Sequence, residues 1–131
     1  MALFLQTWFK PNPNHPGAFM LRVYTYLRRA QTAQHGEEDA FTAWFEAHPY
    51  ATRGADYTDL GVSGLTAPGQ RPGFAALLSA LEADKPDFVL VRRPEDLGRS
   101  LPVTLLARNL IDLRGVDLLC VERAISPTPA A

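Results

Sequence analysis

The spacing of hydrophobic positions predicts alternating strands and helices from residue 21 onward. Four short segments are rich in β-branched and aromatic residues, which is typical of buried strands. The predicted strands are Leu21–Leu27, Thr52–Asp59, Asp87–Val91 and Val116–Val121. Between them, hydrophobic residues recur every three or four positions, which is typical of amphipathic helices. The predicted helices are Thr32–His48, a second helix that begins at Pro72, and Leu101–Leu113.

Prolines and polar residues mark the ends of these helices. Pro49 ends the first helix, because the residue before a proline avoids helical backbone angles. Pro72 and Pro102 suit the first turn of the second and third helices, and Ser100 is a good N-cap for the third. Arg114 and Gly115 follow it. The expected buried stripes are Phe41, Trp44, Phe45 and His48 in the first helix, and Phe74, Leu77, Leu78 and Leu81 in the second.

Strands that are separated by helices favour a parallel sheet with right-handed crossovers. We therefore predict a three-layer α/β domain with a mainly parallel sheet of about four strands and helices on both faces. Ligands in such sheets bind at the carboxyl ends of the strands. Three loops that contain the candidate arginines would meet there: Arg28–Gln34, Leu60–Gly73 and Arg92–Ser100.

The first 19 residues differ from the rest of the chain. Lys10–Gly17 contains three prolines and a glycine, which exclude a helix or a central strand and indicate a linker. Met20 could open the domain after an upstream start codon, or the apolar residues before it could form an arm that packs on the domain or on a second copy. We divide the chain into an N-terminal extension or arm (1–19), the domain (20–125) and a low-complexity tail (126–131).

Composition indicates one folded domain without a strong charge bias. The chain has 131 residues, 47% of them hydrophobic, and a formal net charge of −1. A protein that binds DNA by itself usually has a basic surplus, so contact with nucleic acid would depend on a local cluster of arginines. No stretch is long enough to span a bilayer and no secretory signal is evident, so we expect a cytoplasmic protein.

Neither cysteine nor histidine chemistry is indicated. Cys120 is the only cysteine, which excludes an intrachain disulfide and a cysteine-based zinc site. It lies in an apolar run, where we expect a buried, unreactive thiol. The three histidines have no metal-ligand spacing. We expect no metal and no cofactor.

Five short motifs follow one another between residues 21 and 125. They are Tyr26-Leu27-Arg28 with Gln34, Tyr57-Thr58-Asp59 with Gly61-Val62-Ser63-Gly64, Arg71-Pro72-Gly73-Phe74, Leu97-Gly98-Arg99-Ser100, and Gly115-Val116 with Glu122. In order and spacing they resemble the catalytic domain of the serine recombinases, the resolvases and invertases. Each motif alone is weak, but the five together are fairly specific.

The resemblance implies chemistry on DNA phosphate. In that family a serine hydroxyl attacks a phosphodiester and forms a 5′-phosphoseryl link, arginines stabilise the charge on the phosphate, and no metal is required. By the same resemblance, Arg28, Arg71 and Arg99 match family arginines, and Gln34 matches the glutamine that follows the nucleophile. The alternative to a phosphate-binding role is that each of these arginines is simply a solvated charge on the surface.

Two positions depart from the family pattern. Ala30 stands where the nucleophilic serine is expected, and a methyl group cannot form a phosphate ester. Asp96 stands where an arginine is expected, while Glu95 keeps a carboxylate beside it. Arg92 and Arg93 could compensate for Asp96 if their side chains turn inward. The site residues implied by the resemblance, with these departures, are Arg28, Ala30, Gln34, Arg71, Glu95, Asp96 and Arg99.

These departures favour a recombinase-like protein without strand-exchange activity that keeps a binding or regulatory role. Its expected partners are DNA, bound weakly through the three arginines, a second copy, or an active recombinase. The alternative is an active recombinase or DNA-nicking enzyme in which position 30 is altered or misaligned, and a third interpretation is a structural oligomer. Active family members continue into a dimerising helix and a DNA-binding domain, which the sequence from Ser126 onward does not resemble; we therefore expect a stand-alone protein.

Overall fold

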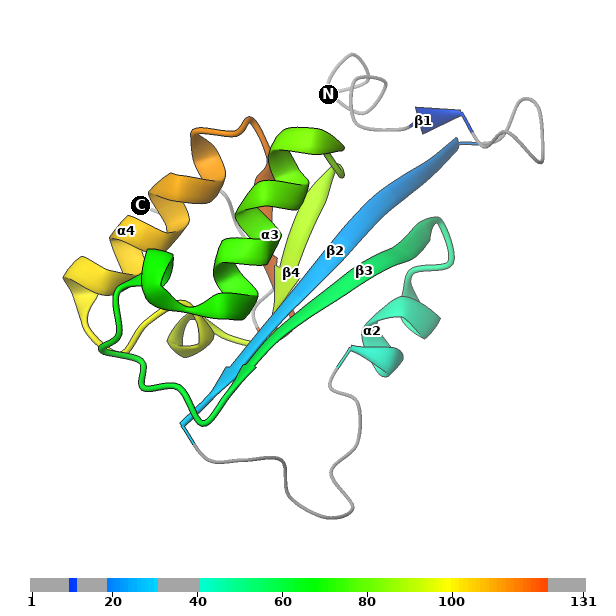
Figure 1. Cartoon of the computed structure of the whole chain (residues 1–131). Coiled ribbons are helices and arrows are strands. Elements are labelled where there is room, and N and C mark those ends of the chain that lie inside the picture. The colour runs from blue at the N-terminus through cyan, green and yellow to red at the C-terminus, as the bar shows by residue number, and fades with distance from the viewer. Residues whose placement is uncertain (1–9, 12–18, 31–40, 123–131) are drawn as a thin grey trace, which may run out of the picture.

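Four parallel strands form the centre of the protein in a computed structural model, which describes residues 10–11, 19–30 and 41–122. The strands are β2 (Phe19–Arg29), β3 (Ala51–Leu60), β4 (Phe88–Val91) and β5 (Asp117–Cys120). They lie side by side in the order β3, β2, β4, β5, and each pairs with its neighbour in parallel (Figure 1). The predicted parallel α/β sheet is therefore confirmed.

Helices cover both faces of this sheet. They are α2 (Thr42–Ala47), α3 (Pro72–Ala83) and α4 (Leu101–Asp112). Figure 1 shows α3 and α4 together on one face and α2 on the opposite face. Two short 3₁₀ turns, η1 (Pro68–Gln70) and η2 (Pro94–Asp96), precede α3 and α4. The predicted three-layer architecture is confirmed.

The sheet separates two hydrophobic clusters because alternate side chains of a strand point to opposite faces. In β2, Tyr24 and Tyr26 pack on the side of α3 and α4, while Leu21 and Val23 pack on the other side. All four residues of β4 are buried, which is typical of a central parallel strand. The predicted stripe of α3 is confirmed, because its four members are buried: Phe74, Leu77, Leu78 and Leu81.

The structure corrects the boundaries of several predicted elements. β2 and β3 are longer than expected, because they pair from Leu21 with Ala51 through to Arg29 with Leu60. β4 and β5 are shorter than the predicted Asp87–Val91 and Val116–Val121, since each has four residues in register with the other. The last helix ends at Asp112, and the predicted final residue, Leu113, is its C-cap.

The first predicted helix is confirmed only in part. Within the described residues it runs from Thr42 to Ala47, and residues 31–40 lie outside the described part of the chain. Phe41 is buried in the second cluster as expected. Trp44 and Phe45 pack against that cluster but stay half-exposed, because α2 lies at the sheet margin beside β3. His48 is also half-exposed and stacks on Trp44 with ring centroids 4.0 Å apart.

The interpretation of Lys10–Gly17 as a linker is wrong at its start. Lys10 and Pro11 form a short strand, β1, that pairs antiparallel with Met20 and Phe19 at the beginning of β2. A proline is tolerated there because β1 is an edge strand. The division of the chain at residues 19 and 125 stays a prediction.

Cys120 is half-buried rather than buried, because β5 is the last strand of the sheet and its residues are only partly covered. Among the described residues, no group of three or more histidine, cysteine or acidic side chains is arranged to hold a metal ion. None of the described helices has the length and apolar character needed to cross a membrane.

The buried cluster beneath α3 predicts a large stability difference between two equivalent leucine truncations. Leu81 is fully buried in α3, whereas Leu65 is 65% exposed in a loop. We expect Leu81→Ala to lower the free energy of unfolding by about 2–5 kcal/mol, since it removes buried methyl groups and leaves a cavity. Leu65→Ala should change it by less than about 0.5 kcal/mol. Urea unfolding followed by circular dichroism measures both, and equal losses would contradict the burial assignment.

Candidate functional site

A cationic pocket lies where β2 and β4 end. It has a volume of about 330 Å³ and combines five arginines with two acidic residues and one alanine. We call it the arginine pocket; it is lined by Arg28, Arg29, Ala30, Arg92, Arg93, Glu95, Asp96 and Arg99. Because the carboxyl ends of parallel strands meet at one edge, residues far apart in sequence come together here.

Arg28 is held rigidly at the end of β2. Its guanidinium donates hydrogen bonds to the carbonyl oxygens of Val62 at 2.9 Å and Glu95 at 2.6 Å, and only 5% of the residue is exposed. Its Nε atom is buried and has no hydrogen-bond partner within the part of the chain that the structure describes. Burial lowers the pKa of this guanidinium, and the nearby charges of Arg71 and Arg99 lower it further. An arginine stays charged despite such shifts, so the group is a fixed positive charge.

Arg71 is a second buried arginine close to this pocket. It is fully buried, and its Nε atom donates to the carbonyl oxygen of Thr66 at 3.2 Å. Both Nη atoms are buried and have no hydrogen-bond partner among the described residues. The guanidinium carbon lies 5.9 Å from the centre of the Phe74 ring. A buried guanidinium with two unused donors is energetically costly, which points to a functional rather than a stabilising reason for its position.

Asp59 orders the backbone around Arg71. Its carboxylate, at the end of β3, accepts hydrogen bonds from the amides of Gly73 (2.7 Å) and Phe74 (2.9 Å) in the first turn of α3. It also accepts a hydrogen bond from the hydroxyl group of Tyr26 at 2.7 Å. Burial raises the pKa of Tyr26, and the hydrogen bond to Asp59 raises it further, so this tyrosine stays protonated. Tyr26 is thus a packing and hydrogen-bonding residue.

Two glycines shape the loop that follows β3. Gly61 has a φ of 71°, a left-handed backbone conformation that glycine adopts without strain. Gly64 has no positive φ, so its role is different. Gly64 is required because a side chain there would collide with Arg99 and lie 2.9 Å from a terminal nitrogen of Arg28. The carbonyl oxygen of Gly64 also accepts the backbone N–H of Arg99 at 2.9 Å.

Asp96 forms an internal ion pair in the pocket wall. Its carboxylate accepts two hydrogen bonds from Arg92, at 2.9 Å and 3.0 Å, and only 1% of the residue is exposed. Arg92 therefore turns inward and offsets the acidic residue, whereas Arg93 lies on the surface 4.0 Å from Glu122. Because Asp96 and Arg92 neutralise each other, neither adds to the net charge that a ligand in the pocket would meet.

The other predicted site residues have different positions. Ala30 is exposed, follows β2 directly and lines the pocket. Glu95 is also exposed, and its main-chain carbonyl rather than its carboxylate contacts Arg28. Arg99 is exposed and lines the pocket. Gln34 lies outside the described residues, and so does Thr32, the residue with a hydroxyl group that stands two positions after Ala30 in the sequence.

The alternative that the three arginines are solvated surface charges does not hold for two of them. Arg28 and Arg71 are buried, and only Arg99 is exposed. Arg28 and Arg99 line the same pocket, and the charges of Arg71 and Arg99 both act on Arg28. The structure therefore brings the three arginines into one electrostatic group.

Residues 23–131 match the family model described as the N-terminal domain of resolvase. The chain belongs to the resolvase family. The resemblance to serine recombinases is thereby confirmed, and the protein is a serine-recombinase-like domain related to DNA recombination. No curated protein sequence gives a significant match.

Solved structures of recombinases share the fold of this resolvase-family domain. The N-terminal catalytic domain of TP901-1 integrase is 28% identical over 83% of this chain and 84% of that chain, with a TM-score of 0.69. A resolvase family site-specific recombinase from Streptococcus pneumoniae is 22% identical over 84% and 78%, with a TM-score of 0.65. The C-terminal catalytic domain of ISC1926 TnpA, an IS607-like serine recombinase, is 24% identical over 79% and 72%, with a TM-score of 0.61.

Two features of the resolvase site were not predicted from the sequence. Arg29 lines the pocket, although only its neighbour Arg28 was singled out by the motif. Asp59 was noted within a motif but was not predicted to cap the start of α3 and to accept the Tyr26 hydroxyl. The parallel pairing of β2 with β3 could have indicated that Asp59 belongs to the site, because it places Asp59 beside Arg28 in register.

The contacts of Asp59 predict that its charge stabilises the fold around Arg71. We expect Asp59→Asn to lower the free energy of unfolding by about 2 kcal/mol, because hydrogen bonds to a charged acceptor contribute about 1.5–3 kcal/mol. Asp56→Asn is the matched control on the same strand, since its side chain is 45% exposed and should cost less than about 1 kcal/mol. Chemical unfolding of both variants measures the difference; a smaller loss at position 59 than at position 56 would contradict the assignment.

Proposed function

We propose that this domain binds the DNA backbone at the arginine pocket without breaking the strand. The observation that carries the proposal is the composition of the pocket lining. Five of its eight residues are arginines, and none carries a hydroxyl or thiol group. Guanidinium groups match the geometry of phosphate oxygens, so such a lining favours binding to a phosphodiester.

The buried Arg28 and Arg71 support this proposal because they place positive charge at fixed positions. Hydrogen bonds to the protein backbone hold Arg28 and Arg71 in place, so a ligand would not have to order them. Charges interact more strongly where water is excluded than at an open surface. The exposed Arg99, which also lines the pocket, would then make the direct and adjustable contact with phosphate.

Ala30 is the reason for proposing binding rather than strand exchange. It lines the pocket at the position that matches the family nucleophile, and its methyl group can neither attack phosphorus nor carry a covalent intermediate. The role of this resolvase-type domain would then be regulatory, through DNA, through a second copy or through an active recombinase. We expect that role to be performed in the cytoplasm.

Arg99 gives the test of phosphate binding. We expect Arg99→Ala to weaken binding to duplex DNA to a similar degree for different sequences, and to reduce the slope of log affinity against log salt by about 1. Fluorescence anisotropy with a labelled duplex at about 50 mM and 200 mM salt measures both. Arg22→Ala is the matched control, because Arg22 lies near the opposite end of β2 and pairs with Asp84.

The salt test separates the possible outcomes. A loss for Arg99→Ala that exceeds the loss for Arg22→Ala supports the pocket as the binding site. Equal losses would mean that total charge rather than the pocket governs binding. No binding by the native protein at the lower salt concentration would also overturn the proposal.

Asp96 is expected to limit the affinity of the pocket for phosphate. A unit charge at about 4 Å contributes about 4 kcal/mol at an effective dielectric constant of 20, and salt and solvent reduce this value. We expect Asp96→Asn to release the charge of Arg92 and to tighten DNA binding by up to about tenfold, which corresponds to about 1.4 kcal/mol. The measurement is the same anisotropy titration.

Glu95→Gln is the control for this prediction. It makes the same change in charge at an exposed side chain of the same pocket, so its effect should be smaller. Because breaking a buried ion pair destabilises a protein by about 3–5 kcal/mol, circular dichroism must first show that Asp96→Asn is folded at the assay temperature. A folded Asp96→Asn protein that binds no tighter than Glu95→Gln would contradict the role given to Asp96.

A further inference from the structure

The arginine pocket holds more positive charge than its own acidic residues offset. Its described lining has five arginines against Glu95 and Asp96, which leaves a surplus of three positive charges. Glu122 lies 4.0 Å from Arg93, but both side chains are exposed, so water screens this pair. Since Asp96 and Arg92 form an ion pair, the surplus comes from the other four arginines of the lining. These are Arg28, Arg29, Arg93 and Arg99.

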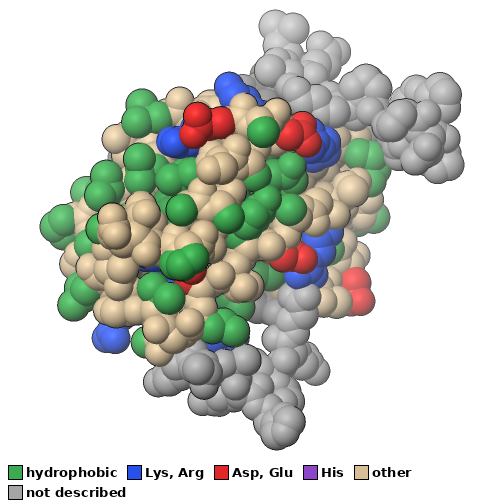
Figure 2. All heavy atoms as spheres, viewed as in Figure 1, with side chains coloured by type: hydrophobic (Ala, Val, Ile, Leu, Met, Phe, Trp, Pro, Cys, Tyr) green, Lys and Arg blue, Asp and Glu red, His purple; other side chains and the backbone are tan. Residues whose placement is uncertain are grey.

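Elsewhere on the described surface, basic side chains commonly lie beside acidic ones. Figure 2 shows this arrangement on the face that α3 and α4 form. Such ion pairs join Arg22 with Asp84, Arg53 with Asp56, and Arg114 with Glu82. The concentration of positive charge in the arginine pocket therefore differs from the charge pattern of this face.

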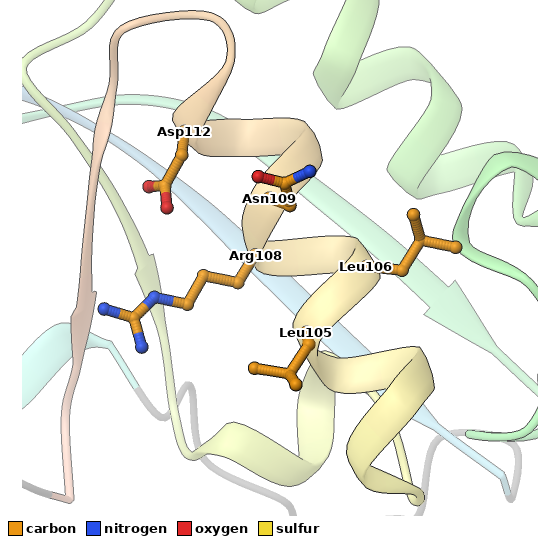
Figure 3. Close-up of a pocket in the computed structure, with 5 residues that line it drawn as sticks. All are labelled: Leu105, Leu106, Arg108, Asn109 and Asp112. Atoms are coloured by element: carbon orange, nitrogen blue, oxygen red, sulfur yellow. The ribbon is translucent and has the colours of Figure 1, made fainter.

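A second hollow, along α4, is larger but has no such surplus. It has a volume of about 480 Å³, and Figure 3 shows its described lining, five side chains that project from this helix: Leu105, Leu106, Arg108, Asn109 and Asp112. One arginine and one aspartate give this lining no net charge. The arginine pocket is thus set apart by its charge and not by its size.

The arginines of the pocket repel one another. Burial lowers the pKa of Arg29, and the charge of Arg92 lowers it further, with a smaller effect from Arg93. Arg28 is subject to the same kind of repulsion from Arg71 and Arg99. Because arginines keep their charge in proteins, the repulsion persists until an anion enters. An anion with two negative charges relieves more of it than an anion with one.

We propose that the arginine pocket binds the terminal phosphate of a DNA strand, a phosphate monoester, in preference to an internal phosphodiester. The inference rests on the proposed function, because it takes DNA phosphate as the ligand of this pocket. It goes further by specifying which phosphate enters. A strand end or a nick, rather than continuous duplex, is then the preferred target.

Charge and geometry both favour the monoester. An internal phosphodiester carries one negative charge. A terminal phosphate carries about 1.5–2 at pH 7 and offers three acceptor oxygens, which matches a surplus of three positive charges more closely. An internal phosphodiester is also joined to a nucleotide on each side, whereas a terminal phosphate is joined to one. A strand end can therefore enter a hollow that continuous duplex can only lie across.

Competition between matched DNA molecules tests the preference. The probe is a short duplex with a 5′-phosphate and a fluorophore attached within its sequence, so that its ends stay free. Unlabelled competitors are the same duplex with a 5′-phosphate, the same duplex with a 5′-hydroxyl, and covalently closed circular DNA at equal nucleotide concentration. At about 50 mM salt, the phosphorylated duplex should compete at least about tenfold better than either of the others.

Two arginine variants locate the preference on the protein. Arg93→Ala removes an exposed charge from the arginine pocket and should reduce the preference at least about threefold. Arg108→Ala makes the same change in the hollow of α4 and should leave the preference unchanged. Circular dichroism of both variants checks that they are folded.

A change of pH tests the charge of the ligand itself. The second pKa of a phosphate monoester is about 6, so the preference should fall several-fold between about pH 7.5 and about pH 5.5, while the arginines stay charged. The acidic groups near the pocket, Glu95, Asp96 and Glu122, act on both duplexes alike, so the ratio of the two affinities removes their contribution. No histidine belongs to the described lining.

A free mononucleotide distinguishes the two sources of a phosphate monoester. A 5′-mononucleotide should compete only at concentrations at least about a hundredfold above those of the phosphorylated duplex, because it lacks the neighbouring phosphates that add to the binding of DNA. Equal competition would assign the pocket to a free nucleotide and overturn the assignment to a DNA strand.

The failure of this inference and that of the proposed function give different results. Equal competition by all three DNA molecules would overturn the preference for ends and leave binding of the DNA backbone intact. No binding of any DNA would overturn both. A preference that Arg93→Ala and Arg108→Ala reduce equally would overturn the assignment to the pocket. A preference that falls with Arg93→Ala alone, and falls at the lower pH, supports the inference.

Discussion

Two guanidinium groups, those of Arg28 and Arg71, are buried close together at the carboxyl edge of the sheet, and the rest of the site is arranged around that charge. Like charges at such a position destabilise a fold unless the surrounding groups hold them. Backbone carbonyls accept hydrogen bonds from both arginines. The carboxylate of Asp59 fixes the start of α3, directly after Arg71. The fold thus maintains a permanent positive charge next to the arginine pocket.

Hydrophobic periodicity predicted the fold well, because the strand period of two residues and the helix period of three to four residues are both clear in this chain. The continuous apolar run of Phe88–Val91 and the alternation in β2 follow from burial on two faces and are visible in the sequence. Boundaries were less predictable, because pairing with a neighbouring strand decides how far a strand extends. The short strand β1 was missed since its two residues, Lys10 and Pro11, have no strand pattern of their own.

The motifs predicted which arginines belong to the site but not how each is used. Arg28 and Arg99 line the pocket, and Arg71 lies buried nearby. Burial could not be inferred for Arg28 and Arg71, because a loop arginine is ordinarily solvated. The sequence did not show whether Arg92 pairs with Asp96, because this ion pair depends on the side-chain rotamers around the 3₁₀ turn η2.

Covalent trapping on DNA tests the central claim most directly. A phosphate pocket without a nucleophile cannot form a covalent link to DNA, so the native protein incubated with supercoiled DNA should give no protein–DNA adduct after denaturing electrophoresis. An active serine recombinase with its own recombination site is the control that shows the assay detects adducts. An adduct formed by the native protein would contradict the account, and its disappearance in Thr32→Ala would identify the hydroxyl that replaces the missing serine.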